Sequence, residues 1–422
     1  MSPPRDDAAA ARPAATARFT GPTLDRASPP HVLTLVALAS IGALNMNMFL
    51  PSLPGMAAYF EADYAVVQLA VSGYLAATAG LQLVIGPLSD RYGRRPVMLG
   101  ALGLFLAATL GCLTAATIET FLAFRLLSAA IVSGLVLSRA MVRDMVGPAQ
   151  AASMIGYVTM GMSMAPMIGP TIGGALDQLF GWRAPFTLLL LGGGFVLWLA
   201  WRDMGETHHH PSDGFMAQFR AYPDLARSRR FWGYAATAAC ASGAFFAFLG
   251  GSPYVASEVL RLSPAASGFW FGALASGYAL GNFLSGRFTA TVGMNAMMLT
   301  GALVAAAGVT TSLWLFSHGH ATAFGFFGPL SMVGLGNGMT LPSANAGMVS
   351  VRPRLAGSAS GLGGALTIGG GAALSALAGA LLEPGTGPYP LLWVMLCSSL
   401  CAIGAVCYVL WVGMWRGPLP SR

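Results

Sequence analysis

The charged residues of this chain are few, and their spacing limits the chemistry they could do. All 22 basic residues are arginines, set against 15 acids and six histidines. The densest group lies at 86–96 (GPLSDRYGRRP), where one acid and three arginines share a short turn. Glycine lets the chain reverse sharply there, so we predict a tight charged hairpin between two apolar stretches. Its key residues are Gly86, Asp90, Arg91, Gly93, Arg94 and Arg95.

Residues for covalent or metal chemistry are not gathered anywhere. The five cysteines lie inside apolar stretches and form no CxxC pair, so we interpret them as small buried hydrophobes. The run His208–His210 has no cysteine nearby, which favours a polar loop over a metal site. A membrane-embedded enzyme would need clustered catalytic side chains at one depth. We therefore expect no enzyme, no metal and no cofactor.

Polar side chains inside apolar stretches are the remaining candidates for a binding site. Asn47 and Arg125 are the strongest, and the others are Tyr74, Gln82, Asn282 and Asn337. An unpartnered buried polar group costs about 1–3 kcal/mol, so bonding between helices explains each of these as well as ligand contact does. For Arg125 the alternative is a side chain that reaches out to lipid headgroups.

A glycine- and proline-rich segment occupies residues 161–174. Gly161, Gly169 and Gly173 recur at helical spacing and would build one smooth face, next to Gly174. Pro166 and Pro170 remove backbone donors and would bend the helix. Ordinary small-residue packing is the alternative interpretation of this pattern.

The elements that must position these residues are membrane helices. The chain is 55% hydrophobic and 9% charged with a mean hydropathy of +0.65, whereas a soluble domain carries roughly 25% charged residues. Stretches free of charge are mostly one span long, at about 20 residues each. They predict an all-α membrane protein with twelve transmembrane helices in two pseudo-symmetric six-helix bundles.

The placement of the arginines predicts the topology. With the N-terminus inside the cell, only Arg125, Arg183 and Arg261 fall on the outer side. The positive-inside bias then puts both termini in the cytoplasm and explains the net charge of +7 without a nucleic-acid partner. The predicted parts are a disordered tail (1–30), two bundles (31–202 and 231–414), a cytoplasmic linker (203–230) and a short tail (415–422).

The ordered pattern Gly-x-x-x-Asp-Arg-x-Gly-Arg-Arg in the 86–96 turn resembles the signature of the major facilitator superfamily. The resemblance implies a transporter that works by alternating access and a turn that acts as a latch between the halves. We expect Arg91 to pair with Asp144, and Asp90 to face the helix start near Gly357 and Ser358.

Further segments resemble the bicyclomycin- and chloramphenicol-resistance exporters of that superfamily. They are Phe49-Leu50-Pro51, Trp182-Arg183-Ala184-Pro185, Ser252-Pro253-Tyr254 and Pro342-Ser343-Ala344-Asn345. In that branch the 161–174 pattern is the antiporter motif. The resemblance implies proton-coupled export of small drug-like molecules or metabolites across a bacterial inner membrane, and we expect a monomer.

Asn47 departs from that branch. Proton-coupled members usually carry Asp two residues before the Phe-Leu-Pro sequence, and an amide cannot carry a proton. Coupling would then use a peripheral acid such as Asp177 or Asp144, or be absent. The missing intramembrane carboxylate argues against lipophilic cations, which leaves a neutral or anionic substrate. The alternative function is an uncoupled facilitator or importer.

Overall fold

The computed structural model describes residues 28–146, 148–207, 222–352 and 355–416, and these residues form helices and no strand. Residues 1–27 and 417–422 of the predicted tails and residues 208–221 of the linker, including His208–His210, lie outside the described residues. The helices of the first half are α1 (Val32–Asn47), η1 (Leu50–Ser52), α2 (Leu53–Tyr59), α3 (Tyr64–Val67), α4 (Leu69–Tyr92), α5 (Arg94–Thr114), α6 (Ile118–Leu127), η2 (Ser128–Val132), α7 (Ser133–Met145), α8 (Pro148–Phe180) and α9 (Arg183–Asp203).

The second half repeats this plan after a short helix. Its elements are α11 (Tyr222–Ala226), α12 (Arg229–Tyr254), the single π-turn η3 (Val255–Val259), α13 (Pro264–Val292), α14 (Met294–Ser317), α15 (Ala323–Ser350), α16 (Ala356–Leu381) and α17 (Tyr389–Arg416). In the described part of the chain, nine helices are long and apolar enough to cross a membrane. The helices α8, α13 and α15 have 33, 29 and 28 residues, each longer than the roughly 30 Å hydrocarbon core requires. The expected twelve-helix membrane fold is confirmed.

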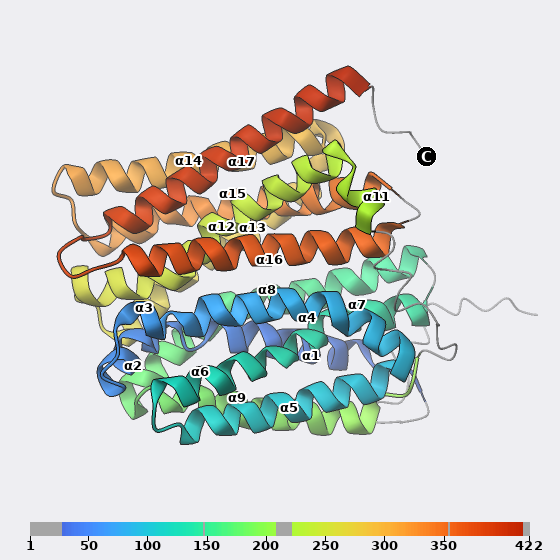
Figure 1. The fold of residues 1–422 in the computed structure, drawn as a ribbon, viewed down its shortest axis with the longest axis horizontal. Helices are drawn as coiled ribbons and strands as arrows, with labels where there is room; N and C mark the ends of the chain where they lie inside the picture. Colours follow the sequence, from blue (N-terminus) through green and yellow to red (C-terminus); the bar gives the residue numbers. More distant parts are fainter. Residues whose placement is uncertain (1–27, 147, 208–221, 353–354, 417–422) are drawn as a thin grey trace, which may run out of the picture.

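The helices lie side by side along the long axis of the molecule in two bundles (Figure 1). The first bundle, α1 to α9, occupies the lower part of the view, and the second, α12 to α17, the upper part. Within the second bundle α13 and α14 pack against α15, and α12 packs against α16 and α17. The bundles meet where α4 packs against α16 and α8 packs against α13.

The two ends of the molecule differ in their turns. We call the end with the α4–α5 turn the arginine-rich end, and the end with the α2–α3 turn (60–63) the opposite end. At the arginine-rich end Gly93 and Gly293 have φ of +94° and +91°, a backbone conformation that suits glycine, at equivalent turns of the two bundles. At the opposite end Thr117, Ser263 and Thr322 accept capping bonds from the first helical turns.

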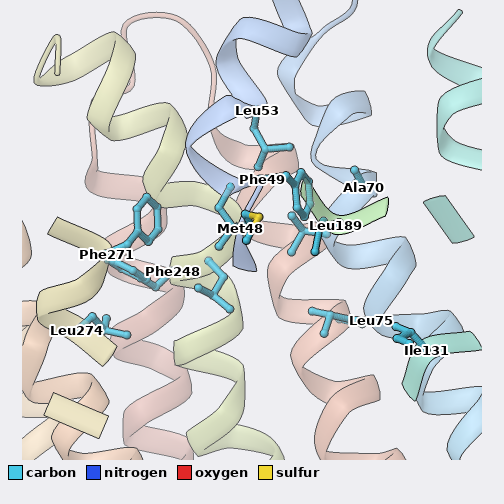
Figure 2. Packing of buried hydrophobic residues seen from close by; sticks show 14 of the residues in the cluster. Met48, Phe49, Leu53, Ala70, Leu75, Ile131, Leu189, Phe248, Phe271 and Leu274 are labelled. Atoms are coloured by element: carbon cyan, nitrogen blue, oxygen red, sulfur yellow. The ribbon is translucent and has the colours of Figure 1, made fainter. Parts of the chain in front are cut away.

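The hydrophobic core crosses from one bundle to the other. One buried cluster includes Met48 and Phe49 from the first bundle together with Phe248, Phe271 and Leu274 from the second (Figure 2). The Phe248 and Phe271 rings pack edge to face, with centroids 5.4 Å apart. The bundles therefore share a packed apolar contact.

Candidate functional site

Arg94 holds the arginine-rich turn together. Its buried guanidinium forms ion pairs with Asp90 of α4 and Asp144 of α7, the latter with Nε 3.0 Å from Oδ2, and it donates to Ser89 Oγ. Charge-assisted hydrogen bonds of this kind are stronger than neutral ones. They join α4, α5 and α7 into one unit at this end of the first bundle.

Glu206 completes the turn from the segment after α9. Its carboxylate accepts hydrogen bonds from the backbone N–H of Arg94 (2.9 Å) and Arg95 (3.1 Å), the first residues of α5. Negative charge is stabilised at a helix N-terminus. A Cβ at Gly93 would lie 2.6 Å from Glu206 Oε2 and would displace this carboxylate, and the positive φ of Gly93 itself favours glycine.

The expected pairing of Arg91 with Asp144 is wrong. Arg91 lies on the exposed side of the last turn of α4 and sits over the Tyr92 ring, 5.4 Å from its centroid. Arg94 begins the next helix with its side chain buried and takes Asp144 instead. At Gly86 the space around an added Cβ is open to 4 Å, so packing does not require glycine at that position.

The antiparallel register of α4 and α16 bears on the predicted position of Asp90. Cβ atoms built at Gly369 and Gly364 would lie 3.9 Å from Ala79 Cβ and 3.0 Å from Gln82 Oε1. If the same register continues along α4 toward the arginine-rich end, Asp90 lies level with the first turn of α16. Contact between Asp90 and that turn stays a prediction, because the carboxylate pairs with Arg94 here.

The small-residue face of α8 packs against both bundles. A Cβ at Gly173 would overlap the Met48 carbonyl oxygen of the first bundle, and one at Gly169 would lie 3.2 Å from Leu44. A Cβ at Gly174 would overlap the Pro264 carbonyl of α13. Pro170 presents its own carbonyl to Gly268, while Gly161 and Pro166 lie in the same helix. The glycines therefore permit close backbone contact between α1, α8 and α13.

Arg125 is enclosed within the first bundle, with 1% of its surface exposed. Its guanidinium donates to the Ala70 carbonyl (3.2 Å), to Asn45 Oδ1 (2.8 Å) and to the Asn45 carbonyl (2.9 Å), and more weakly to Ser128 Oγ (3.4 Å). Four of the five N–H groups of the guanidinium thus have acceptors. None of these acceptors is a carboxylate, so carbonyl dipoles stabilise the charge.

Two aromatic rings cover the Arg125 guanidinium. Phe49 and Tyr74 each place a ring centroid 4.2 Å from its central carbon. The Tyr74 hydroxyl also accepts from Asn45 Nδ2 at 3.2 Å, which adds this tyrosine to the same network. Such cation–π contacts strengthen when desolvated. The alternative in which Arg125 reaches the headgroups is wrong, because the side chain is sealed on all sides.

Asn47 and Asn282 bond to their own helices. Asn47 donates to the Ala43 carbonyl at 2.7 Å and is 3% exposed. Asn282 donates to the Tyr278 carbonyl at 2.9 Å and remains half-buried. The Asn47 side-chain oxygen has no donor among the described residues, so this amide keeps an acceptor.

Gln82 and Asn337 are placed differently. Gln82 faces the second bundle, where its Oε1 lies against Gly364 of α16. Asn337 is 1% exposed and its Nδ2 has no hydrogen-bond partner among the described residues.

A polar joint links the bundles near the opposite end. Gln68, at the start of α4, donates from Nε2 to both the carbonyl and the hydroxyl oxygen of Ser375 on α16, at 2.8 Å each. The carboxamide fits a notch where Gly250 and Gly379 approach it, and a Cβ on either would collide with it. At 1% exposure the joint is shielded from solvent.

Other contacts reinforce this joint. The Tyr64 hydroxyl donates to the Gly250 carbonyl at 2.7 Å, and its ring lies 5.1 Å from that of Tyr254. Between α8 and α13, Thr171 Oγ1 donates to the Gly268 carbonyl at 3.1 Å. These four hydrogen bonds join the bundles in this half of the molecule.

The comparison with known proteins settles the family. The Major Facilitator Superfamily profile matches residues 35–376. The chain belongs to the Major Facilitator Superfamily. It is 30% identical to a chloramphenicol resistance protein of Pseudomonas aeruginosa, covering 72% of this chain and 73% of the relative. It is 28% identical to multidrug resistance protein D of Escherichia coli, covering 86% and 92%.

A solved structure supports the fold. The crystal structure of D-xylose-proton symporter matches with a TM-score of 0.71 at 13% identity, covering 92% of this chain and 98% of that one. The protein is thus a multi-pass membrane transporter of this superfamily and not an enzyme, as expected, and its relatives belong to the resistance-exporter branch.

Sequence reasoning missed several contacts of this transporter. Gln68 and Tyr64 were not singled out, because their role depends on carbonyl groups and glycine notches of distant helices. Glu206 was assigned only to the linker. One signal was available for Gln68: it is an amide inside the charge-free stretch 64–89, as Gln82 is.

Proposed function

We propose that the transporter exports small drug-like molecules or metabolites across a bacterial inner membrane by alternating access, with both termini in the cytoplasm. The chloramphenicol and multidrug resistance relatives, all bacterial, support the substrate class and the direction. In this orientation the arginine-rich end faces the cytoplasm and the opposite end faces outward.

The observation that carries the mechanism is the set of hydrogen bonds that join the bundles near the opposite end. The Gln68–Ser375, Tyr64–Gly250 and Thr171–Gly268 bonds hold the outward end closed. Outward opening requires all of them to break, since each joins one bundle to the other. The ion pairs of Arg94 lie within the first bundle and would move with it as a rigid unit.

Proton coupling is part of this proposal. Asn47 bonds to its own helix and cannot titrate near neutral pH. Asp177 is a peripheral acid one residue beyond the charge-free stretch 145–176, at the outward end of α8. Partial burial raises the pKa of the Asp177 carboxyl to about 6, which would let it exchange protons between mildly acidic and neutral conditions. The competing function is uncoupled facilitation, which Asn47 favours.

Uptake into everted membrane vesicles tests the proposal. A panel that includes chloramphenicol and bicyclomycin is offered with and without an imposed proton gradient, and vesicles lacking the protein serve as the control. Export predicts accumulation that depends on the protein and is raised by a gradient acidic inside the vesicle. Protein-dependent equilibration that ignores the gradient would instead establish an uncoupled facilitator. Without any protein-dependent flux, the export assignment fails.

A further inference from the structure

The outer face of the first bundle is formed by α5 and α9, which pack against each other on the side away from the second bundle (Figure 1). Five exposed side chains of α9 follow one line along the helix, at positions i, i+3, i+7, i+10 and i+14. They are Leu188, Leu191, Phe195, Trp198 and, at the arginine-rich end, Arg202. The Phe195 and Trp198 rings stack with their centroids 5.9 Å apart. We call this line the α9 stripe.

Lipid must cover the α9 stripe in a membrane, because its four apolar side chains are 39% to 67% exposed. From Arg202 back to Leu191 the helix rises about 16 Å, close to half of the roughly 30 Å hydrocarbon core. The stripe therefore matches an acyl chain of one leaflet, and Arg202 lies level with the headgroups. Tryptophan is also typical of this depth.

Two arginines from different helices contact Trp201, which lies beside the end of the α9 stripe. Arg95 of α5 donates from Nη2 to the Trp201 carbonyl oxygen at 3.3 Å. Arg202 places its guanidinium carbon 5.8 Å from the centroid of the Trp201 ring, within the range of a cation–π contact. Since Trp201 is 45% exposed, both cations belong to a surface that combines charge with an aromatic ring.

The acids of this region are engaged elsewhere. Glu206 accepts from two backbone N–H groups at the start of α5, and Asp203 is buried and accepts from the start of α1. Among the described residues, neither Arg95 nor Arg202 forms an ion pair, and the Arg95 guanidinium has one acceptor, the carbonyl oxygen of Trp201. A guanidinium carries five N–H donors, so both arginines keep donors for an anion.

We propose that this end of the α5–α9 face binds an anionic phospholipid, with the phosphate held by Arg95 and Arg202 and one acyl chain along the α9 stripe. The inference goes beyond the proposed transport function and does not depend on the substrate or its direction. A phosphate diester accepts charge-assisted hydrogen bonds from guanidinium groups. A zwitterionic phospholipid would bring its own cation next to the two arginines, so an anionic headgroup fits better.

Native mass spectrometry of the full-length protein tests this preference. The protein is offered equal amounts of dioleoyl-phosphatidylglycerol and dioleoyl-phosphatidylcholine, which differ in the headgroup and not in the chains. The variants are Arg95→Gln, Arg202→Gln and the double variant. The bond from Arg95 to Glu206 survives in them, because its donor is the backbone N–H. Arg287→Gln is the matched control, since it removes an exposed arginine near the same end of the second bundle.

We expect the wild type and Arg287→Gln to retain phosphatidylglycerol in preference to phosphatidylcholine as the first bound lipid. Each single glutamine variant should lower this ratio about fivefold, and the double variant about 25-fold. Arg95→Lys with Arg202→Lys should keep part of the preference, which keeps the test valid if a glutamine variant does not fold. No preference in the wild type, an unchanged preference in the double variant, or an equal loss in Arg287→Gln overturns the inference.

Fluorescence quenching locates the lipid on the protein. In nanodiscs, phosphatidylglycerol with brominated chains should quench the wild type more than brominated phosphatidylcholine does, and Trp198→Phe should lose that excess. An excess that remains in Trp198→Phe places the lipid elsewhere and contradicts the proposal. Glycerol phosphate is added as a soluble competitor. If it displaces the lipid at equal concentration, the site takes a free phosphate ester and the assignment to a lipid fails.

Discussion

Replacing Gln68 with alanine should shift the transporter toward a state that is open at the opposite end. The side chain gives two buried hydrogen bonds to Ser375, and both acceptors lose their donor in the variant. At about 0.5–1.5 kcal/mol per bond, the closed state loses about 1–3 kcal/mol. The population of the opened state should then rise about five- to 150-fold.

Cysteine accessibility measures this shift. Ser72 lies one helical turn below Gln68 and is 3% exposed in the closed structure. In a background without the native cysteines, Ser72→Cys should react slowly with an impermeant maleimide and much faster once Gln68→Ala is added. Gln178→Ala is the matched control, because Gln178 is exposed near the same end of the molecule. Equal labelling rates in the Gln68 and Gln178 variants, both folded, would refute the reasoning.

The glycine notch supplies a second test of the same joint. A Cβ at Gly379 would lie 2.6 Å from Gln68 Oε1, so Gly379→Ala should displace the carboxamide and speed labelling in the same way. In the Gln68→Ala background the carboxamide is gone, and Gly379→Ala should then add little. Such non-additivity is expected of groups in contact or in one hydrogen-bond network, and distant independent sites would instead add.

Three further predictions concern other contacts. Arg94→Gln should lower stability by about 2 kcal/mol and impair transport, while Arg91→Gln stays within about 0.5 kcal/mol, as thermal unfolding in nanodiscs would measure. Gly173→Ala should cost about 1–3 kcal/mol by forcing α8 from α1, whereas Gly194→Ala, with open space around it, should not destabilise; a similar melting temperature for both would contradict the packing argument. Burial raises the pKa of the Asp177 carboxyl from 3.8 to about 6, so the folded protein gains stability when this group is protonated. That stability is complete below about pH 4 and is lost as the pH rises through about 6. Asp177→Asn should remove this pH dependence from the melting temperature.

Much of the architecture follows from where charges are missing. The charge-free stretches predicted twelve helices, and the observed helix bounds fall close to them because a membrane span needs its full length of apolar residues. The reversal at Gly93 was predictable as well, since the motif combines glycine with clustered charge. These features depend on the local sequence and on the lipid surroundings of the helices. Both can be inferred from a single sequence.

Pairings between helices could not be predicted in the same way. The motif predicted a charged turn, but the arginine that takes Asp144 depends on the phase of α4 and on where α5 begins. The Gln68 joint depends on a carbonyl 307 residues away in the chain. A single sequence shows which residues share one face of a helix, but not which other helix that face meets. Contacts between distant helices are therefore visible only in the structure.

The hydrogen bonds of Arg125 bear on which substrates the transporter could bind. Arg125 is one of the two strongest binding-site candidates in the sequence, and four of the five N–H groups of its guanidinium already have acceptors, beneath two aromatic rings. A cation already supplied with acceptors gains little from an anion, since binding would have to replace those bonds. An anionic substrate would therefore have to find its counter-charge elsewhere than at Arg125.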